Sequence, residues 1–373
     1  MSTAVIVGGG PNGLTAAVLL AKQGVEVTML EAADAVGGGV RSGEATGPGL
    51  IHGHCSAIHP MAVGSPVLNS LELERHGLRW LWPEVDCAHP LDDGSCGLLY
   101  RDIGVTADAL GRDGRRWRAL FERPARNFDL LTDDIMGPLL RLPRHPISLA
   151  RFGAPTVLPA ATTARLFRTE QARALFGGVA AHAFRPLHYP MTSAIGMGII
   201  TAGHRHGWPV AAGGSQSITD ALTALLTTFG GKVETGILIE SFTQLPRADV
   251  TLFDLAPTQV ANILGATCRR PWRVASRGSA MGPVRSRSIS RSKAVCHGPI
   301  RARAAPERFT SAAHSQSSRR RNEPYMPGTC RSAHSFWWAS STSPTPAART
   351  ETSIRCGLTP MCHMALPVTP RRL

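Results

Sequence analysis

Short apolar segments alternate with glycine-rich turns over the first forty residues. The run Ala4–Val7 is rich in β-branched residues and predicts a buried strand. Leu14–Gln23 has the apolar pattern of a buried helix, and Glu26–Glu31 predicts a second strand. The chain is therefore expected to begin with a strand, a glycine-rich turn over residues 8–13, a helix and a parallel strand.

The turn has the spacing G-x-G-x-x-G, which suits a dinucleotide. Gly8 lets the chain turn tightly out of the strand, Gly10 leaves room for a pyrophosphate, and Gly13 lets helix and strand pack closely. The helix N-terminus offers unpaired N–H groups and partial positive charge to the phosphates. Glu31 ends the second strand, where its carboxylate can accept hydrogen bonds from ribose hydroxyls. A glycine-rich turn without a ligand is the alternative, and the complete surrounding pattern disfavours it.

Similar patterns return after residue 205. Residues 218–229 have apolar positions at helical spacing, with Ser217 as the expected N-cap and Asp220 three residues further on. A glycine pair ends this helix, and residues 232–235 and 250–254 predict two further strands of the same sheet. Between these parts of the chain, apolar helical patterns alternate with proline-rich loops.

A second glycine-rich loop follows Glu31 and contains Gly37, Gly38 and Arg41. This arrangement resembles the FAD-binding start of the phytoene desaturase and amine oxidase group of flavoproteins. The resemblance implies that the glycine pair closes a loop over FAD and that Arg41 meets the cofactor phosphates. A simple NAD dehydrogenase has no need of this second loop. The alternative for Arg41 is an exposed surface charge.

The resemblance to phytoene-dehydrogenase-like oxidoreductases covers roughly residues 1–265. It implies that a strand near residue 233 returns to the FAD-binding domain and that the backbone of Val233 contacts the adenine. The stretches that carry the similarity are His54–Pro60, Ala88–Leu91, Arg141–Pro146, Gly207–Val210 and Gly213–Ser217.

The resemblance implies an α/β fold in which a substrate domain is inserted into a Rossmann-type FAD-binding domain. The FAD-binding domain is expected from residues 1–69 and 206–265, and the substrate domain from residues 70–205. The implied activity is that of a dehydrogenase or desaturase, in which FAD accepts a hydride from an apolar small-molecule substrate. The sequence identifies no catalytic side chain.

The tail formed by residues 266–373 has a different composition. It holds 19 basic and 3 acidic residues, whereas residues 1–265 hold 21 basic and 23 acidic ones, so the tail carries the excess of the formal net charge of +14. Val, Ile, Leu and Phe make up only 12 of its 108 residues, which predicts a disordered segment.

In the similar flavoproteins this region completes the substrate domain and returns to the isoalloxazine ring, but the tail does not match them. We hypothesise that a frameshift near residue 265 replaced the native sequence and impaired the activity. Restoring the reading frame in the coding DNA tests this, and a restored frame without family-like sequence would contradict it.

Two other readings of the tail remain open. In the first, the tail is a basic arm that could bind nucleic acid by charge alone, without specific recognition. The whole chain would then be a non-catalytic nucleotide-binding remnant with a basic tail. In the second, the tail is an ordered domain that the sequence patterns do not reveal, which predicts that residues 270–373 resist protease.

Several further sequence patterns resemble common functional sites without matching them. His52, His54, Cys55 and His59 fit no usual zinc spacing, so no metal is expected. Residues 213–217 resemble a nucleophile elbow but lack its second glycine, which indicates a turn before a helix. The absence of a long apolar run and of a signal-peptide pattern predicts a cytoplasmic location, with peripheral contact with a membrane left open. The oligomeric state is also left open.

Overall fold

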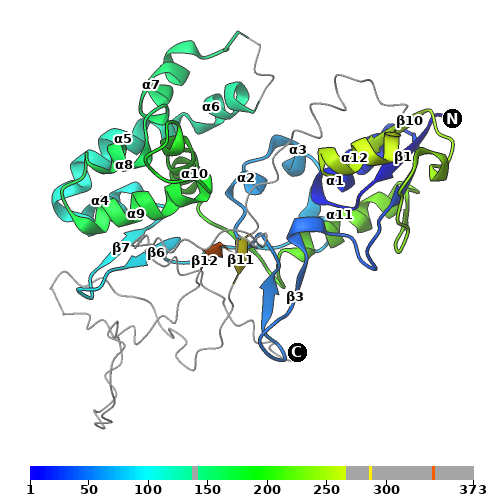
Figure 1. Ribbon diagram of the computed structural model, residues 1–373, viewed down its shortest axis with the longest axis horizontal. Coiled ribbons are helices and arrows are strands. Elements are labelled where there is room, and N and C mark those ends of the chain that lie inside the picture. The colour runs from blue at the N-terminus through cyan, green and yellow to red at the C-terminus, as the bar shows by residue number, and fades with distance from the viewer. Residues whose placement is uncertain (137–141, 266–284, 288–337, 341–373) are drawn as a thin grey trace, which may run out of the picture. The chain divides into compact units, whose positions relative to one another are not determined.

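The computed structural model describes residues 1–136, 142–265, 285–287 and 338–340. The described residues fall into two compact units, one formed by residues 1–81 and 209–265 and the other centred on residues 82–208 (Figure 1). The expectations of a disordered and non-native tail fall almost wholly outside the described residues. Within the tail, only β11 (Arg285–Arg287) and β12 (Trp338–Ser340) are described, as an antiparallel pair.

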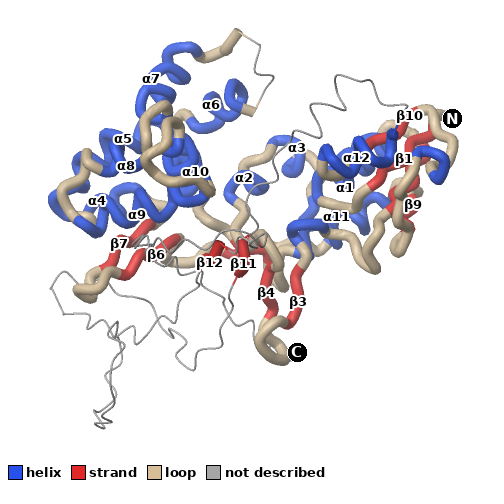
Figure 2. The backbone as a smooth tube through the Cα atoms, viewed as in Figure 1, coloured by secondary structure: helices blue, strands red, loops and turns tan. Residues whose placement is uncertain are grey.

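Unit 1 is built on a parallel four-stranded sheet with the order β10-β1-β2-β9 (Figure 2). β1 (Thr3–Val7) is central and pairs with β2 (Glu26–Leu30) on one side and β10 (Val250–Phe253) on the other. β9 (Lys232–Glu234) completes the sheet beside β2. The predicted strand–helix–strand start is therefore confirmed, with α1 (Pro11–Lys22) joining β1 to β2.

β1 is buried on both sides because helices cover both faces of this sheet. Ala4 and Ile6 pack into one core, with α1 and α11 (Gln216–Thr228). Val5 and Val7 pack into another core, which includes Ile263 of α12 (Pro257–Leu264). The alternation of side chains along a strand explains why an uninterrupted apolar run suits this central position.

Shorter elements complete unit 1. They are η1 (Gly38–Val40), β3 (Ser42–Glu44), β4 (Ile51–Gly53), α2 (Pro60–Val63), α3 (Pro66–Asn69), η2 (Leu73–His76), β5 (Trp80–Leu81), β8 (Val210–Ala211) and η5 (Phe242–Gln244).

Unit 2 is mainly helical, with one antiparallel hairpin of β6 (Cys87–Pro90) and β7 (Cys96–Leu99). Its helices are α4 (Ile103–Ala109), α5 (Gly114–Arg126), α6 (Phe128–Ile135), α7 (Pro146–Thr156), α8 (Ala160–Ala164), α9 (Glu170–Ala180) and α10 (Thr192–His206), with η3 (Gly111–Asp113) and η4 (Ala181–Ala183) between them.

The core of unit 2 is aromatic and contains two buried polar anchors. Trp117 packs against Phe121 and Phe167, and its indole N–H donates to Nε2 of His204 at 2.8 Å. The buried Asp113 carboxylate accepts hydrogen bonds from the backbone N–H groups of Arg168 and Thr169. These contacts join the start of α5 to the start of α9.

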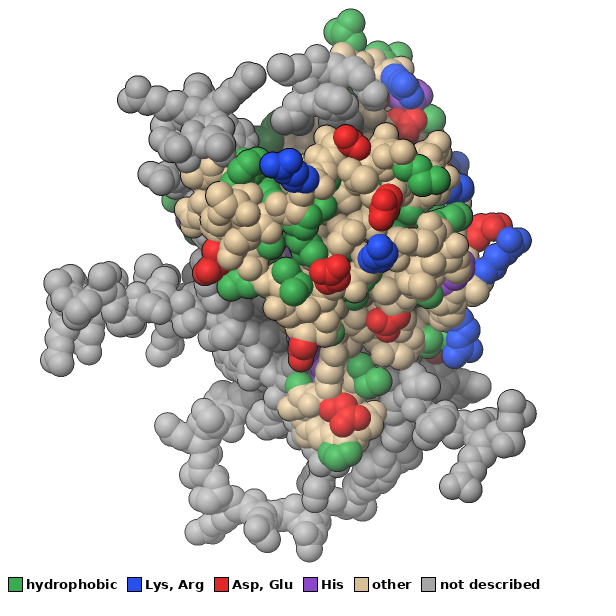
Figure 3. All heavy atoms as spheres, turned by 90° about the vertical axis from the view of Figure 1, so that its right-hand side faces the viewer, with side chains coloured by type: hydrophobic (Ala, Val, Ile, Leu, Met, Phe, Trp, Pro, Cys, Tyr) green, Lys and Arg blue, Asp and Glu red, His purple; other side chains and the backbone are tan. Residues whose placement is uncertain are grey.

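The charges of the described residues are mixed. On the face drawn in Figure 3, acidic and basic side chains are interspersed among apolar ones. Of the helices in the described ranges, none combines the length and the apolar character needed to cross a bilayer.

Candidate dinucleotide site

The first glycine-rich loop connects β1 to α1 at the carboxyl end of the sheet. Gly8 has φ of +105°, and a Cβ atom there would lie 2.4 Å from the backbone oxygen of Asp254. A Cβ atom on Gly13 would lie 2.5 Å from the backbone oxygen of Gly8. Both positions therefore require glycine for packing, as expected for the turn and for the close helix–strand approach.

Glu31 follows β2 and holds the glycine-rich loop in place. Its carboxylate accepts hydrogen bonds from the backbone N–H of Gly9 at 2.6 Å and of Ala33 at 2.9 Å. These bonds use one lone pair on each oxygen, so each oxygen retains capacity for a hydroxyl donor. The predicted contact with a ribose is compatible with this arrangement and stays a prediction.

The second glycine-rich loop lies against the first. The N–H of Gly37, which has φ of +129°, donates to the oxygen of Gly9 at 2.8 Å. A Cβ atom on Gly38 would lie 3.2 Å from Cα of Gly10. Arg41 donates from Nε to the oxygen of Gly38 at 3.3 Å, and it forms no ion pair with a described residue. The predicted Gly37, Gly38 and Arg41 thus lie together in a loop that packs on Gly9 and Gly10.

Val233, the residue predicted to contact adenine, lies in β9 at the other side of β2. It pairs with Met29, and its side chain packs against the core on the α1 side of the sheet. The backbone oxygen of the neighbouring Glu234 accepts a hydrogen bond from the backbone N–H of Glu31 at 2.8 Å. Val233 is therefore close to the end of β2, and its contact with an adenine ring stays a prediction.

The N-terminus of α11 braces the second loop, which the sequence analysis did not foresee. The side chain of Gln216 donates from Nε2 to the oxygen of Val36 at 3.1 Å, and its backbone N–H donates to Oγ of Ser42 at 3.2 Å. The predicted N-cap was wrong, because α11 begins at Gln216 and Ser217 lies inside it. The Ser217 hydroxyl instead donates to the oxygen of Ala212 at 2.7 Å.

Ser215 and His59 form a buried polar pair below this helix start. Ser215 Oγ donates to the oxygen of Ser56 at 2.7 Å, so it accepts from Nε2 of His59 at 2.8 Å. Burial lowers the pKa of His59 to about 4, which keeps the ring neutral at pH 7. Because Nε2 donates, it cannot take a proton from this hydroxyl, and the pair is structural rather than nucleophilic.

Asp254 is a second site residue that the sequence patterns did not reveal. It follows β10 directly, and its carboxylate accepts the backbone N–H of Gly13 at 2.8 Å. The predicted strand over residues 250–254 ended in this acid, but strand order alone decides that the residue lies beside Gly13. Finding Asp254 from the sequence would have required knowing that the chain returns by a parallel crossover to the place next to β1.

The site retains donors that suit a pyrophosphate. Pro11 lacks an N–H group, and the N–H of Gly13 is taken by Asp254. Within the described part of the chain, the N–H groups of Gly10 and Asn12 have no acceptor. Together with the α1 dipole and the Arg41 cation, they fit the pyrophosphate of a dinucleotide.

The histidine and cysteine cluster weighed as a metal site is divided among other contacts. His52 Nε2 lies 2.8 Å from Oγ1 of Thr46, and His59 bonds with Ser215. Over the described ranges, no three His, Cys, Asp or Glu side chains gather in the geometry of a metal site.

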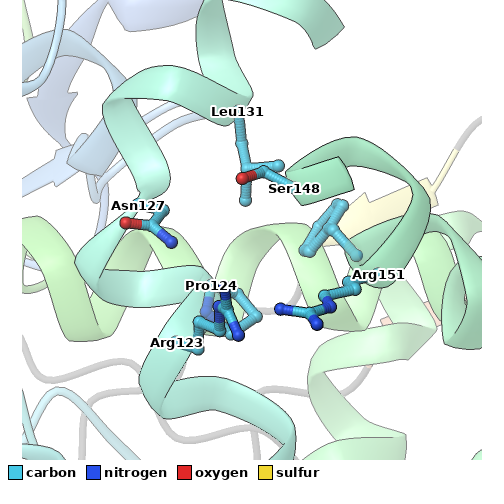
Figure 4. A pocket seen from close by; sticks show the side chains of 7 residues that line it. Arg123, Pro124, Asn127, Leu131, Ser148 and Arg151 are labelled. Atoms are coloured by element: carbon cyan, nitrogen blue, oxygen red, sulfur yellow. The ribbon is translucent and has the colours of Figure 1, made fainter. Parts of the chain in front are cut away.

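Unit 2 contains a small pocket between α5, α6 and α7 (Figure 4). Its empty volume is about 250 Å³, including space open to solvent. Arg123 and Arg151 lie on one side of it, with Leu131 and Ser148 opposite (Figure 4). Nothing in the described residues connects this pocket with a substrate, so the apolar substrate stays a prediction.

Comparison with known proteins concerns the family and the fold of the chain. Residues 6–71 match the family of NAD(P)-binding Rossmann-like domains. Hydroxyneurosporene desaturase of Cereibacter sphaeroides is 30% identical over 205 residues, which cover 48% of this chain and 38% of the desaturase. The chain therefore spans well under half the length of this curated relative.

One of the solved structures that resemble the chain shows the same fold. An oxidoreductase from Methanosarcina mazei aligns with a TM-score of 0.52 and 17% identity, covering 74% of this chain and 64% of that one. A redesigned putrescine oxidase aligns with a TM-score of 0.49 and 18% identity, covering 74% and 63%. The expected Rossmann-type α/β fold and the resemblance to desaturase-like oxidoreductases are confirmed.

Proposed function

Because the chain resembles a desaturase and has the fold of a dinucleotide-binding oxidoreductase, we propose that it binds FAD as a dehydrogenase-like or desaturase-like protein. Bound FAD would accept a hydride from an apolar substrate. The observation that carries the proposal is the contact between two glycine-rich loops, Gly37 N–H to Gly9 oxygen at 2.8 Å, at the N-terminus of α1. The second loop supports FAD over NAD.

The residues of this chain then have distinct roles. The N–H groups of Gly10 and Asn12 bind the pyrophosphate, and Arg41 balances its charge. Glu31 accepts hydrogen bonds from the ribose hydroxyls with its remaining lone pairs. Val233 contacts the adenine through its backbone. Each of these groups binds or orients the cofactor, and none takes part in proton transfer.

The first test is the visible absorption spectrum of the purified full-length chain, with the released cofactor identified after denaturation. Flavin bands, or their appearance after incubation with FAD, support the proposal. A colourless protein that cannot be reconstituted with FAD refutes it. Arg41→Ala should weaken FAD binding about tenfold, through the loss of one charge-assisted contact. Arg79→Ala, which removes an exposed arginine of unit 1 that makes no ion pair with a described residue, should leave binding unchanged.

A second candidate is a nucleotide-binding remnant that does not turn over substrate and whose tail binds nucleic acid by charge. The 19 basic and 3 acidic residues of positions 266–373 favour it. It predicts that bound FAD is not reduced by polyene or amine substrates and that RNA binding falls steeply as salt rises. Reduction of the flavin by an apolar substrate would exclude this candidate.

A further inference from the structure

Asp254 lies against three of the four glycines of the first loop, Gly8, Gly10 and Gly13. Its backbone N–H donates to the oxygen of Val7 at 2.8 Å, which fixes the residue beside the end of β1. Its own backbone oxygen occupies the place of a Gly8 side chain. Its carboxylate lies on the open side of Gly10 and bonds to Gly13. Asp254 is therefore part of the loop's packing, although it is separated from the loop by more than 200 positions.

The Asp254 carboxylate occupies space that the glycine motif leaves free. A Cβ atom on Gly10 would lie 2.5 Å from Oδ2 of Asp254. The same oxygen accepts the N–H of Gly13, which is the third residue of α1. A carboxylate at this position stabilises the helix N-terminus by a hydrogen bond and by its charge.

A phosphate bound at this site would compete with the Asp254 carboxylate for the positive N-terminal end of α1. The donors left for it, the N–H groups of Gly10 and Asn12, belong to the same helix start as the N–H held by Asp254. Glu31 places a second carboxylate on the loop through its bond to Gly9. The cation that the second loop contributes is Arg41, which forms no ion pair with a described residue. An incoming diphosphate therefore meets a site whose positive helix end is partly neutralised.

We infer that Asp254 is an internal anion that holds the glycine-rich loop in its binding shape and limits the affinity of the site for diphosphates. The inference rests on the proposed function, because it concerns the same dinucleotide site. Asp254 holds the loop through its hydrogen bond with Gly13. It limits diphosphate affinity because its negative carboxylate lies close to the negative phosphates. Asparagine can keep the hydrogen bond through Oδ1 while removing the charge, so the two parts are separable.

The test compares Asp254→Asn with the wild-type full-length chain by calorimetric titration with ADP and with adenosine. We expect Asp254→Asn to bind ADP about tenfold more tightly, with the gain shrinking at high salt, and adenosine with unchanged affinity. Asp249→Asn is the matched control. Asp249 lies before the other end of β10, and its carboxylate accepts the N–H of Thr3 at 2.8 Å on the exposed side. This variant should bind ADP as the wild type does.

The outcomes separate the inference from the proposed function. Unchanged or weaker ADP binding by Asp254→Asn, with wild-type binding intact, overturns the limiting role. Equal changes for ADP and adenosine also overturn it, because a merely structural residue affects both ligands. Failure of every form to bind ADP or FAD refutes the proposed function as well. Asp254→Ser, which is also uncharged, provides the same comparison if the asparagine variant does not fold.

Discussion

Gly8→Ala tests whether the glycine-rich loop is specified by packing as well as by backbone conformation. The position has φ of +105°, and the added Cβ atom would lie 2.4 Å from the backbone oxygen of Asp254. That oxygen cannot move freely, because the N–H of Asp254 is bonded to Val7 in the sheet. The strained backbone costs on the order of 1–3 kcal/mol, and the overlap adds a similar amount.

The matched control is Gly24→Ala. Gly24 has φ of +80° in the turn between α1 and β2, but a Cβ atom there has no neighbour within 4 Å. It therefore carries the backbone strain without the overlap, and its substitution should lower the free energy of unfolding by roughly 1–2 kcal/mol. Gly8→Ala should lower it by roughly 3–5 kcal/mol.

Urea denaturation followed by far-ultraviolet circular dichroism measures both changes, and titration with FAD measures the site. We expect Gly8→Ala to lose FAD binding, because the loop must shift to accommodate the methyl group, and Gly24→Ala to keep it. Equal destabilisation by the two variants, or retained FAD binding by Gly8→Ala, would refute the reasoning from packing.

Two further predictions concern buried polar groups. Asp113→Ala should lower the free energy of unfolding by about 3 kcal/mol in urea denaturation, because it removes a buried carboxylate that accepts the part-buried N–H groups of Arg168 and Thr169. An effect no larger than that of the exposed Asp108→Ala would contradict this. Burial lowers the pKa of His59 and of His204 to about 4, below the usual 6.5, so their contribution to stability is present above pH 6.5 and is lost as pH falls towards 4. His204→Asn should flatten the fall of the melting temperature over that window, and an unchanged slope would contradict the assignment.

The start of the fold was predictable because its signals are local. A β-branched run, spaced glycines and an apolar helix fix β1, the turn and α1 without reference to distant residues. Gly37, Gly38 and Arg41 were found from a resemblance, and the structure explains their spacing by the bond between Gly37 and Gly9.

The missed features depend on contacts between distant segments. Asp254 and Gln216 meet the glycine-rich loops only because β10 lies beside β1 and α11 packs on α1. The error at Ser217 has a similar cause. A serine before an apolar run is a sound N-cap signal, but Gln216 is drawn into the helix start by Val36 and Ser42.

The order of strands in unit 1 has a consequence for biosynthesis. β1 and β2 are complete by residue 30, but their neighbours in the sheet, β9 and β10, are made only after residues 82–208 of unit 2. Until residue 253 leaves the ribosome, the outer edges of this apolar strand pair have unpaired backbone groups, which are prone to pairing with other chains. The nascent chain should therefore depend on chaperones most while its first thirty residues lack their partner strands.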